Sequence, residues 1–395
     1  MKRFLCLSFI LLFAASFAFS ADFGLLIDQK LETEKIENQL LTYTPAVTPW
    51  FSWNGGKGVS LYLSAVLSLE YKRTDAASGW HDPFIIPELG RSAFSWRNDT
   101  MSFEAGRINY QDACGFIAAG LFDGFSFQAV TSGGIISAGV FYTGLLYRET
   151  AKIIMTQEDN GDYAAPWDFS DNFKYYFSSK RLFASVRWSY PLSEMINLNA
   201  QLLAQFDLNG REQGINSQYA QILADLYPAG IMKISLGALF ETMQYGGEFG
   251  IGFGALARFS MDLPTSLNDS LNLAFKFTSG YKDAKMPGFI PISGVQQGMI
   301  FTEGLSGLAV IGLDYDIMII KSLTAQAAFK YFIRTYEAES GGGLYGGEFW
   351  ASLAWQPFND IRAALGGGAF IPAMGNVNPD ADMMWKISAS VILSF

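Results

Sequence analysis

The chain has 395 residues, of which 50% are hydrophobic, 15% aromatic and only 16% charged. Ordinary soluble domains carry about 25% charged residues, so this composition disfavours a protein whose whole surface meets water. The formal net charge of −10 excludes the basic footprint of a nucleic-acid-binding protein. The hydrophobic content likewise excludes an intrinsically disordered chain.

The first twenty residues have the pattern of a secretory signal peptide. Lys2 and Arg3 precede an apolar segment over 4–19, and Ala18-Phe19-Ser20 supplies small residues for cleavage after Ser20. A membrane anchor would need a longer apolar core, and a lipoprotein cysteine would not precede the apolar segment as Cys6 does. We therefore predict a signal peptide over 1–20 and a single domain over 21–395. Cys114 is then the one remaining cysteine, which excludes an intramolecular disulfide and predicts a small buried or rim residue.

The domain over 21–395 contains no uninterrupted apolar segment long enough for a membrane-spanning helix. The richest candidates, 229–240 and 249–261, are broken by Lys233 and Arg258. A helical span needs about 20 apolar residues. For an exported, aromatic-rich chain, the other structure that satisfies its backbone hydrogen bonds in lipid is a closed β-barrel.

Extended or alternating segments follow one another along the domain. In chain order they are Asp22–Glu32, Leu41–Trp53, Val59–Tyr71, Leu89–Arg97, Thr100–Asn109, Leu121–Thr131, Ile135–Tyr147, Tyr175–Tyr190, Met195–Asp207, Tyr219–Tyr227, Ile231–Met243, Phe249–Leu263, Leu271–Tyr281, Leu305–Ile317, Leu323–Tyr336, Tyr345–Gln356, Ile361–Phe370 and Trp385–Phe395. Because proline removes ladder donors, we expect the second segment, with Pro45 and Pro49, to be short, bulged or near an edge of regular pairing. The others are typical of strands with one apolar and one polar face.

The last segment ends the chain on an aromatic carboxy-terminal residue. Ile387, Val391 and Phe395 fall on one parity, whereas Ser388 and Ser390 fall on the other. A strand that ends in this way resembles the terminal assembly signal of bacterial outer-membrane barrels, with Phe395 as the signal residue. We expect it to pair with the preceding strand and with the amino-terminal strand, which would close the sheet.

The connections fall into two sets. Short turns (Ser132–Gly134, Pro191–Glu194, Pro228–Gly230, Pro357–Asp360) alternate with long loops (Thr74–Pro87, Arg148–Lys174, Lys282–Thr302, Ile371–Met383). Short periplasmic turns and long external loops are typical of bacterial barrels. The sequence therefore predicts an all-β fold, a closed antiparallel transmembrane β-barrel of about 18 strands, with 16 as the alternative. A secreted sandwich or propeller would carry more charge on its outward face.

The polar parity of the strands predicts the wall of an aqueous lumen, because barrels of 16–18 strands enclose a channel. The candidate pore-lining residues carry both signs of charge: Glu70, Lys72, Arg181, Arg187, Asp225, Lys233, Glu241, Arg258, Asp262, Lys276, Asp314, Asp316, Lys330, Arg334, Glu348, Arg362 and Lys386. Acidic residues in the loop 148–174 would either favour cations mildly at the mouth or simply keep a solvated loop soluble, because salt screens exposed charges. The near balance within the wall predicts no strong ion preference.

Two long loops are candidates to narrow this lumen, those over 148–174 and 282–302. The second is the better candidate, because an apolar loop left in water would be costly. Inward-facing Tyr62, Phe183 and Trp350 are candidates to stack on sugar rings, although such rings also pack simply against their neighbours in the wall.

Enzymatic chemistry finds little support in the sequence. His81 is the one histidine, beside Asp82 in a predicted turn, and no Gly-x-Ser-x-Gly nucleophile motif is present. No His/Cys cluster predicts a metal site, and the segment 158–162 does not match a calcium-binding loop. We therefore expect no catalytic residues, no metal and no cofactor.

One pair of segments supports a family comparison. Phe103-Glu104-Ala105-Gly106-Arg107, followed by Gly120-Leu121-Phe122-Asp123-Gly124, resembles the Gly-Arg strand and the downstream Phe-Asp-Gly of alginate-export-type porins. That resemblance implies eighteen strands and a uronate substrate. Those exporters also have a strongly cationic lumen, which this chain lacks.

Together these patterns predict an outer-membrane porin for passive diffusion of small hydrophilic solutes, with sugars and uronates as candidates. Its expected partners are outer-membrane lipids, the barrel-assembly machinery and the solutes themselves, with no nucleic acid. The alternative is a surface adhesin or structural barrel whose long external loops bind ligands. A fatty-acid transporter would need an amino-terminal plug, and only about 20 residues lie between the predicted cleavage site and Leu41.

Overall fold

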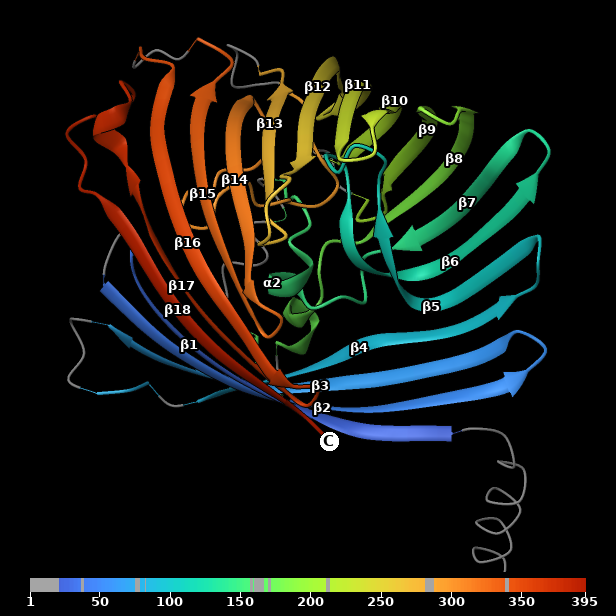
Figure 1. Ribbon diagram of the computed structural model, residues 1–395, viewed down its shortest axis with the longest axis horizontal. Helices are drawn as coiled ribbons and strands as arrows, with labels where there is room; N and C mark the ends of the chain where they lie inside the picture. Colours follow the sequence, from blue (N-terminus) through green and yellow to red (C-terminus); the bar gives the residue numbers. More distant parts are fainter. Residues whose placement is uncertain are drawn as a thin grey trace, which may run out of the picture.

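In the computed structural model, the described residues are 21–36, 39–74, 79–81, 83–156, 159, 167–169, 172–210, 214–280, 288–337 and 341–395. Within these ranges an 18-stranded antiparallel sheet closes on itself, because each strand pairs with the next and β18 pairs with β1 (Figure 1). The predicted closed barrel, with eighteen rather than sixteen strands, is confirmed. The predicted signal peptide lies outside the described residues.

The strands are long enough to cross a bilayer at a tilt, which takes about 9–11 residues. In chain order they are β1 (Ala21–Lys35), β2 (Gln39–Gly56), β3 (Val59–Thr74), β4 (Phe84–Arg97), β5 (Met101–Gln111), β6 (Ala119–Thr131), β7 (Gly134–Tyr142), β8 (Arg181–Ser193), β9 (Ile196–Asp207), β10 (Ile215–Ala229), β11 (Met232–Tyr245), β12 (Glu248–Asp262), β13 (Ser270–Thr278), β14 (Leu308–Ile320), β15 (Leu323–Arg334), β16 (Leu344–Phe358), β17 (Ile361–Ile371) and β18 (Met384–Ser394). The helical turns are α2 (Arg148–Ala151), η1 (Phe173–Tyr176) and η2 (Pro372–Met374). No helix among the described residues is both long and apolar enough to span a membrane.

The two ends of the chain meet along one seam of the barrel. β1 pairs with β18 from Leu26 opposite Ser394 to Lys35 opposite Trp385. Beyond these pairs, the N–H of Leu25 donates to the carbonyl of Phe395, and the N–H of Phe395 donates to the carbonyl of Leu25, each at 2.9 Å. Figure 1 shows blue β1 beside red β18. The final strand therefore closes the sheet, as its alternation predicted.

Alternation separates an apolar outer face from the interior most clearly on β12. Phe249 and Phe253 are 63% and 52% exposed on the outside, whereas Gly250 and Gly252 between them are buried. Large apolar side chains on β9 and β10 are equally open, with Leu202 64% and Ile222 61% exposed. An apolar belt of this extent is typical of a surface that faces lipid.

The predicted turns and loops lie at opposite ends of the barrel, because consecutive strands are antiparallel. The end that carries the turns after β6, β8, β10 and β16 is called the short-turn end below. The other end is the long-loop end, and it carries the connections after β3, β7, β13 and β17. In Figure 1, α2, from the connection after β7, lies within the ring of strands.

The expectation for β2 was wrong about its length but right about irregular pairing at the prolines. This strand is not short or marginal but spans 18 residues, and it pairs with β1 even at Pro45 and Pro49. The effect of the prolines falls on the other edge, where the pairing with β3 omits Thr44, Pro45, Thr48 and Pro49. Because proline has no N–H to donate, pairing is interrupted on the β3 side of the strand and stays intact on the β1 side.

The predicted start of β8 at Tyr175 was also wrong. Residues Phe173–Tyr176 form the helical turn η1, and the strand begins at Arg181. Tyr176 is buried in a cluster with Tyr147 and Trp167 of the preceding connection. The aromatic residues that suggested a strand therefore pack within a loop.

Candidate functional site: a lumen narrowed by three connections

The described parts of three connections from the long-loop end enter the barrel and meet inside it. They follow β5 (112–118), β7 (143–180) and β13 (279–307). The N–H of Ile292 donates to the carbonyl of Ile117 at 2.7 Å, and the N–H of Ile154 donates to the carbonyl of Ile292 at 3.1 Å. Ile153 also forms a β-bridge with Ser293. The described parts of these connections therefore form one hydrogen-bonded unit, called the plug below.

The plug packs against one side of the barrel through an apolar core. Buried side chains of β5 to β12 and of all three connections form this core: Ile108, Cys114, Phe116, Ile117, Phe122, Phe141, Leu146, Ile153, Phe183, Leu203, Tyr219, Leu239, Leu256, Phe289, Ile292 and Leu305. Full burial of one such side chain is worth about 1.5–3 kcal/mol. The loop over 282–302, the better candidate to narrow the lumen, does fold inward over its described part, and Met286 lies outside the described residues.

The connection after β5 depends on Asp112, which the sequence did not single out. Its buried carboxylate accepts four backbone N–H groups, from Gly115, Phe116, Ile117 and Ala118, at 2.9–3.1 Å. A short acidic side chain that bonds its own downstream backbone is typical of tight turns. The sequence signal for this turn is Asp112, followed three residues later by Gly115 and then by the apolar residues Phe116, Ile117 and Ala118.

Two carboxylates of the wall hold the connection after β13. Glu348 on β16 accepts the N–H groups of Met299, Ile300 and Phe301 at 2.7, 3.0 and 2.8 Å. Glu241 on β11 accepts the N–H of Ile290 at 2.9 Å. These two predicted pore-lining residues are 2% and 0% exposed. Their side chains bind the loop and do not meet solvent.

Arg181 has a comparable place beneath the connection after β7. Its side chain is fully buried, with Asp159 at 3.3 Å and Asp207 at 3.8 Å. An arginine in the dry interior needs such partners, because an unpaired buried charge is costly. It is the third member of the predicted pore-lining set that contacts the plug and not the open lumen.

Several of the remaining predicted residues pair along the inner wall. Lys72 contacts Glu70 at 2.8 Å, Lys233 contacts Asp225 at 3.2 Å, and Lys386 contacts Glu32 and Glu34 at 3.0 Å each. Arg187 donates to the Gln201 side chain and to the Gln111 carbonyl, and Arg334 donates to the Tyr345 hydroxyl. Alternating signs therefore cover much of the wall.

Two lysines and five exposed or half-buried charged residues complete the predicted pore-lining set. Lys276 donates to the Gln297 side chain at 2.9 Å, and Lys330 donates to the Gln297 carbonyl at 2.7 Å. Both lysines therefore contact the plug as well as the wall. The rest are exposed (Arg258, Asp262, Arg362) or half-buried (Asp314, Asp316).

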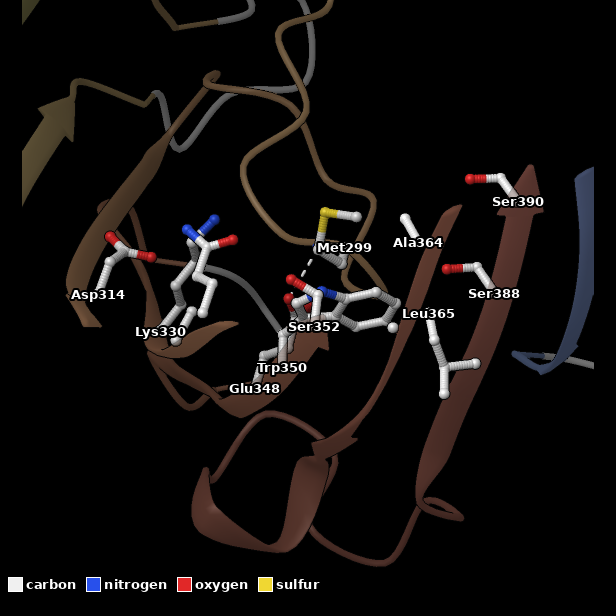
Figure 2. A pocket seen from close by; sticks show the side chains of 13 residues that line it. Met299, Asp314, Lys330, Glu348, Trp350, Ser352, Ala364, Leu365, Ser388 and Ser390 are labelled. Atoms are coloured by element: carbon white, nitrogen blue, oxygen red, sulfur yellow. Dashed lines mark hydrogen bonds between the residues drawn. The ribbon is translucent and has the colours of Figure 1, made fainter. Parts of the chain in front are cut away.

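A cavity of about 370 Å³ lies beside the plug on the inner wall of β14 to β18. Figure 2 shows Met299 of the plug above Glu348 and Trp350, with Asp314 and Lys330 on one side. Ser352, Ser388 and Ser390 supply hydroxyls to the same cavity. A further cavity of about 740 Å³ near the short-turn end is lined by serines and by Arg91, Arg97 and Glu104. Both cavities are suited to hydrated, polar solutes.

The rings expected to stack on sugars are mostly covered. Phe183 is 0% and Trp350 is 7% exposed, and both belong to apolar clusters. Tyr62 is half-buried, with its ring stacked on Trp50 and the Arg91 guanidinium above it. Packing with neighbouring side chains therefore accounts for these rings better than sugar binding does.

Cys114 lies in the plug and is 4% exposed, as expected for a small buried residue. Burial, together with nearby Asp112, raises the pKa of its thiol to about 12. We predict that a maleimide reagent labels this thiol in unfolded protein but not in the folded barrel, because the thiolate is the reactive form. Mass spectrometry of protein labelled with and without denaturant measures this, and equal labelling would contradict the burial.

Two negative findings bear on other chemistry. His81 is exposed, and its backbone N–H donates to the backbone carbonyl of Lys72. The neighbouring Asp82 lies outside the described residues. Within the described ranges, no group of three or more His, Cys, Asp or Glu residues is placed to hold a metal ion.

The comparisons with known proteins support the architecture. No protein-family model and no curated relative matches the sequence. Among solved structures, the chain is similar to Pseudomonas aeruginosa OccK5 (OpdH), with a TM-score of 0.63, 13% identity and coverage of 95% of this chain and 98% of that one. It is also similar to P. aeruginosa OccK7 (OpdD), with a TM-score of 0.61, 14% identity and coverage of 95% and 99%. The outer membrane protein opdK of the same organism gives 0.61, 12%, 95% and 99%.

At these identities the likeness shows the fold alone. It agrees with the eighteen-stranded closed barrel over nearly the whole chain. It does not support the finer resemblance of Phe103–Arg107 and Gly120–Gly124 to alginate-export-type porins.

Proposed function

We propose that this chain is a bacterial outer-membrane channel through which small hydrophilic solutes diffuse passively. The observation that carries the proposal is a closed barrel with an apolar outer belt, whose interior keeps one polar, charge-lined cavity beside the plug and another near the short-turn end. A barrel of this strand number is wide enough to enclose an aqueous passage. The structural neighbours, one of them described as an outer membrane protein, have the same architecture.

The proposed pore lining is the predicted set without Arg181, Glu241 and Glu348, because these three are buried against the plug. Nine of the other fourteen residues are basic and five are acidic, and Glu32 and Glu34 add negative charge beside Lys386, which supports a polar passage with weak ion preference. Sugars and uronates are candidate solutes. The covered rings of Phe183 and Trp350 weaken the case for a dedicated sugar site. We assign the protein no enzymatic step, no metal and no cofactor.

Liposome swelling with a panel of sugars, amino acids and uronates tests this function. We expect swelling with small solutes and a rate that falls as solute size increases, since the plug narrows the passage. Protein-free liposomes and liposomes with heat-denatured protein are the controls. Failure to swell with every solute, in liposomes shown to contain folded barrel, would overturn the proposal.

The exposed wall arginines give a separate prediction on selectivity. Arg258 on β12 and Arg362 on β17 face the barrel interior, and both are exposed. Replacing both by glutamine removes positive charge from the passage, so the reversal potential in a salt gradient should shift towards cation preference. Lys321→Gln, in the exposed turn after β14, is the matched control and should leave it unchanged. An unchanged double variant would place these arginines outside the conducting path.

One observation favours a second candidate function, ligand binding by the loops. Phe169 and Phe173 of the connection after β7 are 63% and 41% exposed, and their rings stack at 6.0 Å. Exposed aromatic side chains of this kind are typical of binding surfaces. A folded barrel that fails to conduct, but binds a surface ligand through Phe169 and Phe173, would favour an adhesin.

A further inference from the structure

The β5–β6 hairpin leaves the barrel wall at a glycine. β4 pairs with β5 from Arg97 opposite Ser102 only as far as Ser92 opposite Arg107. β5 and β6 stay paired beyond this point, up to Gln111 opposite Ala119. Gly106 has φ +123°, and a Cβ built there would lie 2.1 Å from the Ser92 carbonyl oxygen. Only glycine fits this backbone, so Gly106 is the hinge at which the hairpin departs from its neighbour.

Beyond the hinge the hairpin tip reaches the inner wall at β9 and β10. The N–H of Ala113 donates to the Gln201 side chain on β9 at 2.8 Å, and the N–H of Cys114 donates to the Gln221 side chain on β10 at 3.1 Å. The Gln201 amide also donates to the Tyr110 hydroxyl at 2.8 Å. The angle at Gly106 therefore decides how far this part of the plug extends into the lumen.

A buried ion pair spans the hinge. Arg107 is 6% exposed and donates to both carboxylate oxygens of Asp123, at 2.9 and 2.7 Å. It also donates to the carbonyl of Leu89 on β4 at 2.8 Å and to the carbonyl of Leu145 after β7 at 3.0 Å. One side chain thus joins both strands of the hairpin to the wall strand it has left and to the next plug connection. Bidentate arginine–carboxylate pairs fix the relative geometry of the two side chains as well as stabilising the contact.

We propose that Arg107 and Asp123 form a clasp that sets the angle of the β5–β6 tip and so the bore of the channel. They act as positioning residues, because their bonds go to the protein and not to a passing solute. The inference rests on the proposed function and adds a specific determinant of it. It also gives the Gly106-Arg107 and Asp123-Gly124 pairs a mechanical role, as residues that face one another across the hairpin.

Single-channel recordings of Arg107→Gln and Asp123→Asn test the clasp. Both should show larger open-channel current noise and a changed mean conductance, while Arg107→Lys should lie between them and the wild type. The matched control is Lys35→Gln, which breaks the 3.2 Å Lys35–Asp382 pair between β1 and the connection after β17, away from the hinge and from both cavities. This control should behave as wild type. Wild-type noise and conductance in folded Arg107→Gln would overturn the inference, as would equal effects of Lys35→Gln.

A covalent lock tests the clasp within one assembled barrel, recorded before and after reduction. A Cβ at Gly237 on β11 would lie 2.9 Å from the Cys114 sulfur, close to the spacing a disulfide requires. Gly237→Cys should therefore tie the tip to the wall under oxidising conditions. In the Gly237→Cys/Arg107→Gln double variant, added reductant should raise the noise, whereas Gly237→Cys alone should stay quiet. No rise in the double variant would refute the clasp, while failure of the wild type to conduct would refute the proposed function itself.

Discussion

Replacing Glu348 with alanine is expected to release the connection after β13 and to increase the conductance of the channel. Its carboxylate accepts three consecutive backbone N–H groups, from Met299, Ile300 and Phe301. Each buried donor left without an acceptor costs about 1–3 kcal/mol, which is enough in sum to detach this segment. Glutamine, which keeps one carbonyl acceptor but loses the charge, should give an intermediate conductance. Single-channel recording in planar bilayers measures the change.

The matched control is Glu303→Ala, because this residue lies in the same connection and is exposed. It removes one negative charge without removing acceptors for the segment 299–301. If Glu348 anchors the loop, the current through Glu348→Ala is larger than the current through Glu303→Ala. Equal currents in the two variants would show that charge alone, and not the anchoring of the loop, controls the passage.

Deleting Val391–Phe395 is expected to prevent formation of the barrel. The deletion removes the pairs of β18 with β1 from Leu26 to Gln29, and the two 2.9 Å hydrogen bonds between Leu25 and Phe395. It also leaves Ile361–Ala363 of β17 without their partners on β18. In lipid each exposed backbone group costs several kcal/mol, so an open seam of this length should not insert. Heat-modifiable migration of the reconstituted protein is the measurement, and a truncated chain that still migrates as a folded barrel would contradict the role of the seam.

Phe395→Ala separates the seam from the proposed assembly signal. The Phe395 side chain is 70% exposed, so its loss should leave the backbone bonds to Leu25 in place. We therefore expect this variant to fold in detergent as the wild type does. A reduced yield in the outer membrane of cells would then report recognition by the assembly machinery, and a normal yield would argue against the signal.

Most of the fold could be predicted because a period of two survives in the sequence wherever one face is apolar. β12 shows this best, with Phe249, Ile251 and Phe253 outside and glycines inside. The role of the last strand followed from the same alternation and from the parity of the strand count. The apolar character of 282–302 also pointed to its inward position, which its described residues confirm.

The plug could not be predicted in detail, because its contacts join residues far apart in the chain. Strand parity places Glu241 and Glu348 on the inner face, but cannot show that a loop will cover them. Asp112 depends on the backbone of the next turn, and η1 depends on aromatic contacts with Tyr147 and Trp167. For Glu241, Glu348 and η1, tertiary contacts decided between a solvated residue and a structural one, whereas the Asp112 carboxylate bonds the local backbone of 115–118.

Stepwise conductance of the purified, folded protein in planar bilayers decides whether this barrel is a channel. We expect discrete steps of uniform size, little ion preference, and larger steps for Glu348→Ala. A barrel that inserts with the seam intact yet passes no current, for the wild type and Glu348→Ala alike, would contradict a channel and leave loop-mediated binding as the function to pursue.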